Sequence, residues 1–347
     1  MSLRSALVTL GSLAVGFALC IFAIAISGVH IRDVLVQVAR ADRSAIPVLA
    51  ALTALNTLLS SCKWRAVDKT LRGSANPELT IFESFTLTSL GTALGQFLPV
   101  HVSMPITRTL GTRVHGRAVR RGTLGTYFEQ VFDFGFACVL MLASLAVYFL
   151  GRSAFNWLLI AVPSALVSVW LAGSTLSMIR RLAARVRDDS ITASRWRQYA
   201  VELSHSGLLQ SALGRKLMCL SALRFAVLTV MAAEVGRSVH ADIPWWHFAF
   251  AMPAAILATA AGLTPGSLGV WEFSYVGALA LIGTPLRVAT TVALANRLLG
   301  SAAALLVAIL ATPLFLATRT QSRRAKSNDL GTQASEPVPH GCEASHV

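Results

Sequence analysis

Two acidic residues, Glu129 and Asp133, lie four positions apart inside a long apolar segment. This spacing places both side chains on one face of a helix, one turn apart. Carboxylates at membrane depth are costly and indicate function by default. The pair could share a proton, bind a cation, or pair with arginines of a neighbouring segment, for which Arg108 is the nearest candidate. Glu129 lies nearer the end of the segment, so an interfacial anchor explains it equally well, whereas the deeper Asp133 favours function.

A second set of polar residues lies in the last third of the chain. Glu272 follows the stretch Gly262-Leu-Thr-Pro-Gly-Ser-Leu-Gly269, and Asn296 and Arg297 lie inside the last long apolar run. A lone buried arginine is costly and a paired one much less so, which predicts an ion pair between Glu272 and Arg297. The pair would belong either to a ligand site, together with Asn296, or to a structural clamp between two segments.

The segments that carry these residues have the length of membrane spans. Hydrophobic residues make up 54% of the 347 residues and charged residues only 13%, against roughly a quarter charged in soluble domains. A spanning run of about 20 residues must be helical, because lipid offers backbone groups no hydrogen-bond partner. The runs are 7–27, 46–61, 124–150, 156–176, 217–235, 248–263 and 288–317. We therefore predict an all-α, polytopic integral membrane protein, with about six to eight transmembrane helices and one or two broken or re-entrant helical hairpins.

The first predicted break lies in the apolar segment 79–107, between two basic clusters. Pro99 and Pro105 interrupt helical hydrogen bonding there. Two half-helices that enter from one side and return to it would keep both basic clusters on that side. Gly91 and Gly95 form a GxxxG pair, which we interpret as a packing surface.

The second predicted break contains Thr264, Pro265, Gly266 and Gly269. Its arms, 245–263 and 270–282, either cross the membrane fully or form a second hairpin from the opposite face. Paired interruptions of this kind are typical of transporters with a binding site at the midplane. Two hairpins from opposite faces would give the fold an inverted pseudo-symmetry.

The basic residues indicate the topology. Lys and Arg outnumber Asp and Glu by 30 to 16 and cluster at 63–72, 108–121, 179–216 and 319–326. The positive-inside rule places these segments, and both termini, on the cytoplasmic side of the inner or plasma membrane. Lys63 is then part of a cytoplasmic cluster, and Arg224 is an interfacial anchor. The first run is longer than a signal-peptide core, which favours a retained anchor. Residues 1–318 would form the membrane domain and residues 319–347 a disordered cytoplasmic tail.

No motif predicts catalysis, a cofactor or a metal site. The five cysteines have no CxxC or zinc spacing, and the chain contains no HExxH, GxSxG or P-loop sequence. His101, at the first break, is a weak candidate for a ligand or proton carrier. Arginines beside membrane helices ordinarily indicate topology, so we do not expect nucleic acid as a partner.

The second break resembles the hallmark turn of the lysylphosphatidylglycerol synthetase transmembrane-region family of flippase-like bacterial inner-membrane proteins. The residues that carry the resemblance are 256–263, Thr264-Pro-Gly-Ser-Leu-Gly-Val-Trp-Glu272 and Asn296-Arg297, with Ser267 in place of a glycine. The first half is similar through Trp64-Arg65, Phe97-Leu98-Pro99 and the Glu129 to Asp133 element. It departs from the family at 101–108, which keeps Arg108 but lacks the glycines and the acid, and at Gln130, which replaces an arginine.

The resemblance implies a role in binding or moving a phospholipid or a lipid-linked envelope intermediate, without enzymatic activity. Arg108 and Arg297 would contact an anionic headgroup, while Glu129, Asp133 and Glu272 tune or couple the site. Expected partners are membrane lipids and envelope-biosynthesis enzymes. A scaffold for a glycosyltransferase is the main alternative. A membrane-embedded transferase that uses Glu129, Asp133 and His101 is a further one.

Overall fold

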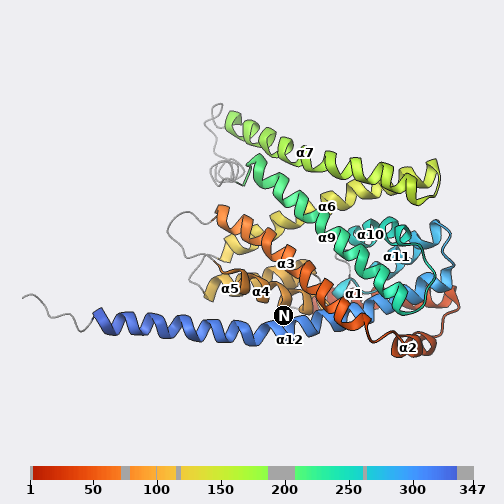
Figure 1. The fold of residues 1–347 in the computed structure, drawn as a ribbon, viewed down its shortest axis with the longest axis horizontal. Helices are drawn as coiled ribbons and strands as arrows, with labels where there is room; N and C mark the ends of the chain where they lie inside the picture. The colour runs from red at the N-terminus through yellow and green to blue at the C-terminus, as the bar shows by residue number, and fades with distance from the viewer. Residues whose placement is uncertain are drawn as a thin grey trace, which may run out of the picture.

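The computed structural model is a bundle of α-helices, and its last helix, Leu286–Gln333, extends beyond the rest of the bundle (Figure 1). The structure describes residues 3–71, 79–98, 100–114, 119–186, 208–260 and 264–333, and these residues contain no strand. The long helices are α1 (Leu3–Ser27), α3 (Ala45–Leu71), α6 (Val119–Leu150), α7 (Ala154–Val186), α9 (Ser211–Ser238) and α12 (Leu286–Gln333). The short elements are α2 (Ile31–Ala39), α4 (Ile81–Leu94), α5 (Val100–Val114), α10 (Trp245–Ala260), the 3₁₀ turn η1 (Pro265–Ser267) and α11 (Val270–Leu281).

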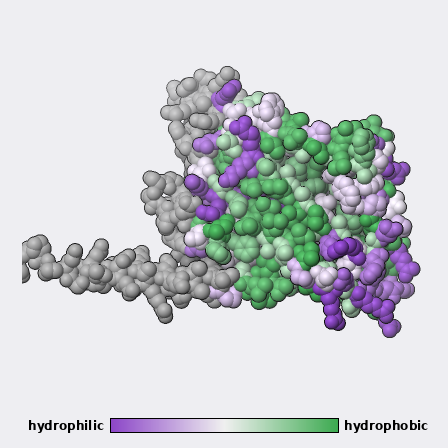
Figure 2. Space-filling model, in the orientation of Figure 1, coloured by the Kyte–Doolittle hydropathy of each residue, from purple (hydrophilic) through white to green (hydrophobic). Residues whose placement is uncertain are grey.

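Five described segments are long and apolar enough to cross a bilayer, namely Ala45–Leu71, Gly122–Leu150, Ala154–Ile179, Ser211–Ser238 and Leu286–Pro313. The second half of α1 and helix α2 meet the same test only together, as a pair bent by 88°. Figure 2 shows the corresponding apolar band between two hydrophilic ends. The predicted all-α polytopic membrane fold is confirmed. Helix α12 continues past position 318 to Gln333, and the division into a membrane domain and a tail stays a prediction.

Helices α4 and α5 form an antiparallel hairpin. A capping box between Thr80 and Glu83 begins α4, and Gly95 ends it. A Cβ atom on Gly91 would lie 2.7 Å from Thr107 Oγ1, and one on Gly95 would lie 3.2 Å from Ser103 Oγ. The two glycines therefore allow the close packing that the GxxxG pair predicts.

The interruption between α4 and α5 is shorter than predicted, because one of the two predicted proline breaks does not end a helix. Helix α5 continues through Pro105, which lies in its second turn and removes one backbone hydrogen bond without ending the helix. The other proline, Pro99, lies outside the described residues.

Helices α10 and α11 form a second hairpin around the turn η1. His247 Nδ1, near the start of α10, lies 2.9 Å from Thr284 Oγ1, just after the end of α11. The two arms therefore begin and end at the same end of the molecule, and the segment turns back instead of crossing. The turn needs left-handed backbone at Gly266 (φ 60°), Ser267 (φ 54°) and Gly269 (φ 78°), which explains two of its three glycines.

The two hairpins open toward opposite ends of the bundle. At one end, Thr109 near the end of α5 lies 3.1 Å from Thr123 at the start of α6. At the other end, Arg152 just after α6 donates to the Leu281 carbonyl at the end of α11, at 3.0 Å. Because α6 connects the two ends, the hairpins approach each other from opposite directions, and Figure 1 shows them in opposite halves of the molecule. This is the arrangement that an inverted pseudo-symmetry requires.

Candidate functional site

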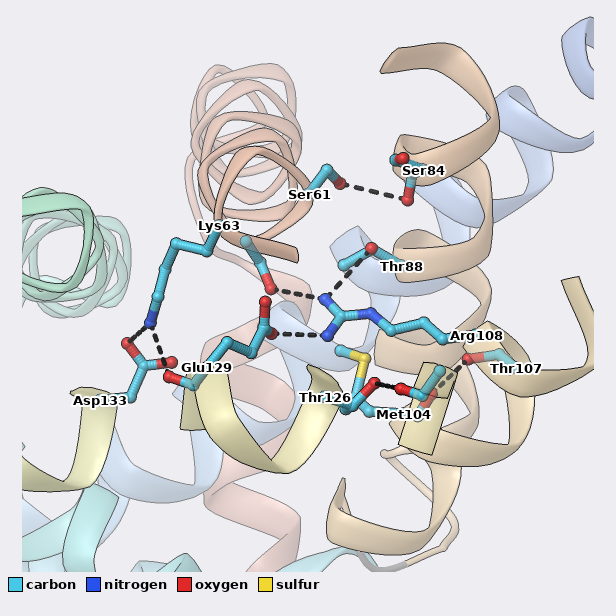
Figure 3. Close-up of polar contacts among 12 residues, drawn as sticks. Ser61, Lys63, Ser84, Thr88, Met104, Thr107, Arg108, Thr126, Glu129 and Asp133 are labelled. Carbon is cyan, nitrogen blue, oxygen red and sulfur yellow. Dashed lines mark hydrogen bonds and ion pairs between the residues drawn. The ribbon is translucent and has the colours of Figure 1, made fainter. Parts of the chain in front are cut away.

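The first charged contact joins α5 to α6. The side chain of Arg108 is 0% exposed and its Nη1 lies 2.5 Å from Glu129 Oε1. Its Nη2 donates to Ser60 Oγ at 3.0 Å and to Thr88 Oγ1 at 3.3 Å (Figure 3). The guanidinium also lies over the Trp64 ring, 5.0 Å from its centroid. Of the three roles left open for the carboxylate pair, the structure shows pairing with an arginine, between Arg108 and Glu129.

Asp133 is held by two cations, and neither was predicted at this site. Lys63 Nζ lies 2.6 Å from Asp133 Oδ1, and Arg224 Nη1 contacts Asp133 Oδ2. Lys63 also donates to Ser221 Oγ at 2.8 Å and to the Glu129 carbonyl at 3.2 Å. Arg224 Nε donates to Asn56 Oδ1 at 3.1 Å.

Lys63 and Arg224 are therefore not free surface charges, because both side chains turn inward to Asp133; which side of the membrane they lie nearest stays a prediction. Both lie near the ends of apolar runs, where basic residues ordinarily indicate topology. A signal was nevertheless present, because Asn56, Ser60 and Lys63 follow the spacing i, i+4, i+7 and share one face of α3. That polar face packs toward α6 and α9. We call Lys63, Arg108, Glu129, Asp133 and Arg224 the charged cluster.

The second charged contact joins the tip of the α10–α11 hairpin to α12. Arg297 Nε lies 3.5 Å from Glu272 Oε1, so the predicted pair is confirmed. Glu272 Oε2 accepts the backbone N–H of Gly269 at 2.6 Å and so caps α11. This carboxylate already satisfies the positive end of α11, so that helix end is not free for an anionic ligand.

Arg297 also joins the tips of the two hairpins. Its Nη2 donates to the carbonyl of Gly266 at 2.6 Å and to the carbonyl of Gln96 at 3.4 Å. A Cβ atom on Gly266 would overlap with the Gln96 carbonyl, so the two backbones are in direct contact. We call this arrangement of Gln96, Gly266, Glu272 and Arg297 the tip contact. It supports the structural-clamp interpretation of Glu272 and Arg297.

A cavity of about 320 Å³ lies between the charged cluster and the tip contact. Of the predicted site residues, Glu129, Asp133, Asn296, Arg297 and Gly266 line it. Arg108 and Glu272 do not line it, because each is buried behind the residue it pairs with. In this structure Arg108 holds Glu129, and its predicted contact with a ligand stays a prediction.

Thr264 and Gly269 of the second break shape the tip and are not among the residues that line the cavity. Thr264 Oγ1 donates to the Leu268 carbonyl at 2.8 Å, and Gly269 packs so closely on Gly16 of α1 that a Cβ atom would overlap with its backbone. Pro265 opens the turn η1.

The wall of the cavity is amphipathic. Polar side chains come from α3, α4, α6, α9, α10 and α12 and from the two tips, namely Asn56, Ser60, Thr92, Gln96, Glu129, Gln130, Asp133, Ser221, Arg224, Thr259, Ser267, Asn296 and Arg297. The apolar part comes from α5, α6, α9, α10 and α11, namely Met104, Phe134, Phe136, Ala137, Phe225, Leu228, Met231, Met252, Ile256 and Trp271. Two buried polar atoms of this wall, Glu129 Oε2 and Ser267 Oγ, have no hydrogen-bond partner within the described part of the chain. Such a wall suits a ligand with both a charged and an apolar part.

Within the described ranges, no three His, Cys, Asp or Glu side chains come together in a group that could hold a metal ion. A sequence model of the family described as lysylphosphatidylglycerol synthase TM region matches residues 9–308. The matched range contains both hairpins, the charged cluster and the tip contact. No curated protein shows a significant match to the chain.

Proposed function

Because the chain belongs to the lysylphosphatidylglycerol synthase TM region family, we propose that it binds a membrane lipid in the central cavity and moves it between the two leaflets. The lipid is a phospholipid or a lipid-linked envelope intermediate with an anionic headgroup. In this proposal the headgroup lies in the polar part of the cavity, and the acyl chains lie along its apolar part and in the bilayer.

The observation that carries the proposal is the position of the cavity. It lies where two hairpins from opposite ends meet, and its wall combines Asp133, Arg224 and Arg297 with a set of aromatic and aliphatic side chains. Charged groups at membrane depth are costly, and in transporters they gather where broken helices form a midplane site. The volume of about 320 Å³ falls at the lower end of the roughly 300–1,000 Å³ range of small-molecule pockets, which is enough for a headgroup.

The tip contact offers a route for movement. Two hydrogen bonds join the hairpin tips through Arg297, which donates one to the Gly266 carbonyl and one to the Gln96 carbonyl. Separate displacement of each hairpin would open the cavity alternately toward the two ends of the bundle, as alternating access requires.

The test is lipid movement in liposomes that contain the purified protein and a fluorescent phospholipid, with a reductant that quenches only the outer leaflet. The proposal predicts that the protein speeds exchange between leaflets. Gly300 lines the cavity, and a Cβ atom there would have no heavy atom within 4 Å. Gly300→Phe should therefore fill the cavity and abolish the exchange. Gly277→Phe is the matched control, because Gly277 has equally open space and does not line the cavity.

Wild-type protein that leaves lipid exchange unchanged would remove the proposal. That result would favour a membrane partner that holds an envelope-synthesis enzyme without moving lipid. Equal exchange by wild type and Gly300→Phe would show that movement does not pass through this cavity.

A further inference from the structure

The charged residues around the cavity include one cation more than their carboxylates need. The cations are Lys63, Arg108, Arg224 and Arg297, and the carboxylates are Glu129, Asp133 and Glu272. Glu129 is paired with Arg108, and Glu272 with Arg297. Asp133 alone is paired with two cations.

The surplus cation is Arg224, because Lys63 also donates hydrogen bonds to two groups other than Asp133. The Lys63 side chain is 0% exposed, and its ammonium donates to Asp133, Ser221 and the Glu129 carbonyl. Removal of Lys63 would leave Ser221 Oγ and the Glu129 carbonyl without this donor. The Arg224 side chain is 19% exposed and lines the cavity. Its Nε and Nη1 are bonded to Asn56 and Asp133, and its Nη2 has no hydrogen bond within the described residues.

The pairing of Asp133 makes Arg224 free to exchange partners. Breaking a buried ion pair is costly when it leaves a charge without a partner. If Arg224 turned from Asp133 to a ligand, Asp133 would remain neutralised by Lys63. Neither Arg108 nor Arg297 can do this, because each would leave an unpaired carboxylate behind.

We infer that Arg224 binds the negative charge of the ligand and makes the cavity selective for lipids whose headgroup carries one net negative charge. This inference rests on the proposed lipid-binding function and names the residue and the charge that it recognises. One anionic headgroup balances the surplus cation, so that four cations face four anions. Ser267, which is 4% exposed and lines the cavity with an unpartnered hydroxyl, supplies a second donor to a phosphate oxygen.

The experiment compares two lipids with identical acyl chains, phosphatidylglycerol and phosphatidylcholine, by native mass spectrometry of the purified full-length protein. Wild type should prefer phosphatidylglycerol by roughly tenfold, the effect of one hydrogen bond between charged groups. Arg224→Gln should reduce this preference to about twofold or less, chiefly by weakening phosphatidylglycerol binding. Arg224→Lys should keep most of the preference. Arg237→Gln is the control, because Arg237 is on the same helix, is 73% exposed and pairs only with Glu234 among the described residues.

The outcomes separate this inference from the proposed function. If wild type binds neither lipid, the proposed function fails. If wild type binds both lipids equally, or if Arg224→Gln keeps the full preference, the inference fails and lipid binding stands. An Arg224→Gln protein that does not fold also contradicts the inference, because the surplus of one cation requires Asp133 to remain satisfied without Arg224. A separate experiment adds soluble glycerol 3-phosphate. If this compound binds as tightly as phosphatidylglycerol, the ligand of Arg224 is a soluble phosphate ester and the inference of a lipid ligand fails.

Discussion

The backbone of Gly266 lies directly against the backbone carbonyl of Gln96, so that the tips of two hairpins from opposite ends of the bundle touch. Gly266 has a φ of 60° and Arg297 donates to its carbonyl at 2.6 Å. Glycine is therefore needed at this position for two reasons. The backbone is left-handed, and the Gln96 carbonyl leaves no room for a Cβ atom.

Gly266→Ala should destabilise the protein by about 2 kcal/mol or more, since it adds both left-handed strain and a clash with Gln96. The measurement is thermal unfolding in detergent. Gly277→Ala is the control, because a Cβ atom there would meet no heavy atom within 4 Å. Equal melting temperatures for the two variants would contradict the contact between the tips.

The pair of Arg108 and Glu129 should show strong energetic coupling. Arg108→Met leaves the Glu129 carboxylate buried and unpaired, which typically costs about 3–5 kcal/mol. The double variant Arg108→Met, Glu129→Gln should lose clearly less than the sum of the two single variants. A double-mutant cycle of unfolding free energies measures the coupling. Additive losses would show that the two side chains do not depend on each other.

The two hairpins should open on opposite sides of the membrane. Thr80 precedes α4 and Pro285 follows α11, and both positions are exposed. In a background without the native cysteines, a membrane-impermeant thiol reagent should label Thr80→Cys and Pro285→Cys from opposite sides. The positive-inside rule further predicts that Thr80→Cys is labelled from the cytoplasm. Labelling of both positions from one side would exclude the inverted arrangement.

The broken helices and two of the ion pairs could be predicted from the sequence, because both follow from the cost of unsatisfied groups in lipid. The proline and glycines at 262–269 predict an interruption of the helix from local backbone chemistry alone, whatever the surrounding fold. A buried Arg297 needs a carboxylate, and Glu272 follows the break that packs against its helix. In both cases a local rule was enough to identify the partner.

The roles of Lys63 and Arg224 could not be predicted in the same way. Their positions near the ends of apolar runs are equally typical of residues that anchor a helix at the membrane surface. What decides between the two roles is the packing of α3 and α9 against α6, which brings both cations to Asp133. The contact between Gln96 and Gly266 likewise depends on the approach of two hairpins, which no local pattern specifies.

The most direct test of lipid binding in the central cavity is photo-crosslinking in membranes with a phospholipid whose photoreactive group is attached to the headgroup. Peptides that contain Gln96 or Asn296 should be labelled, because both residues line the cavity. The peptide that contains Leu166 should not be labelled, because this residue is 68% exposed near the middle of the apolar span of α7, where we expect it to contact acyl chains and not headgroups. Labelling confined to the ends of the bundle, with none at Gln96 or Asn296, would contradict a headgroup site inside the membrane.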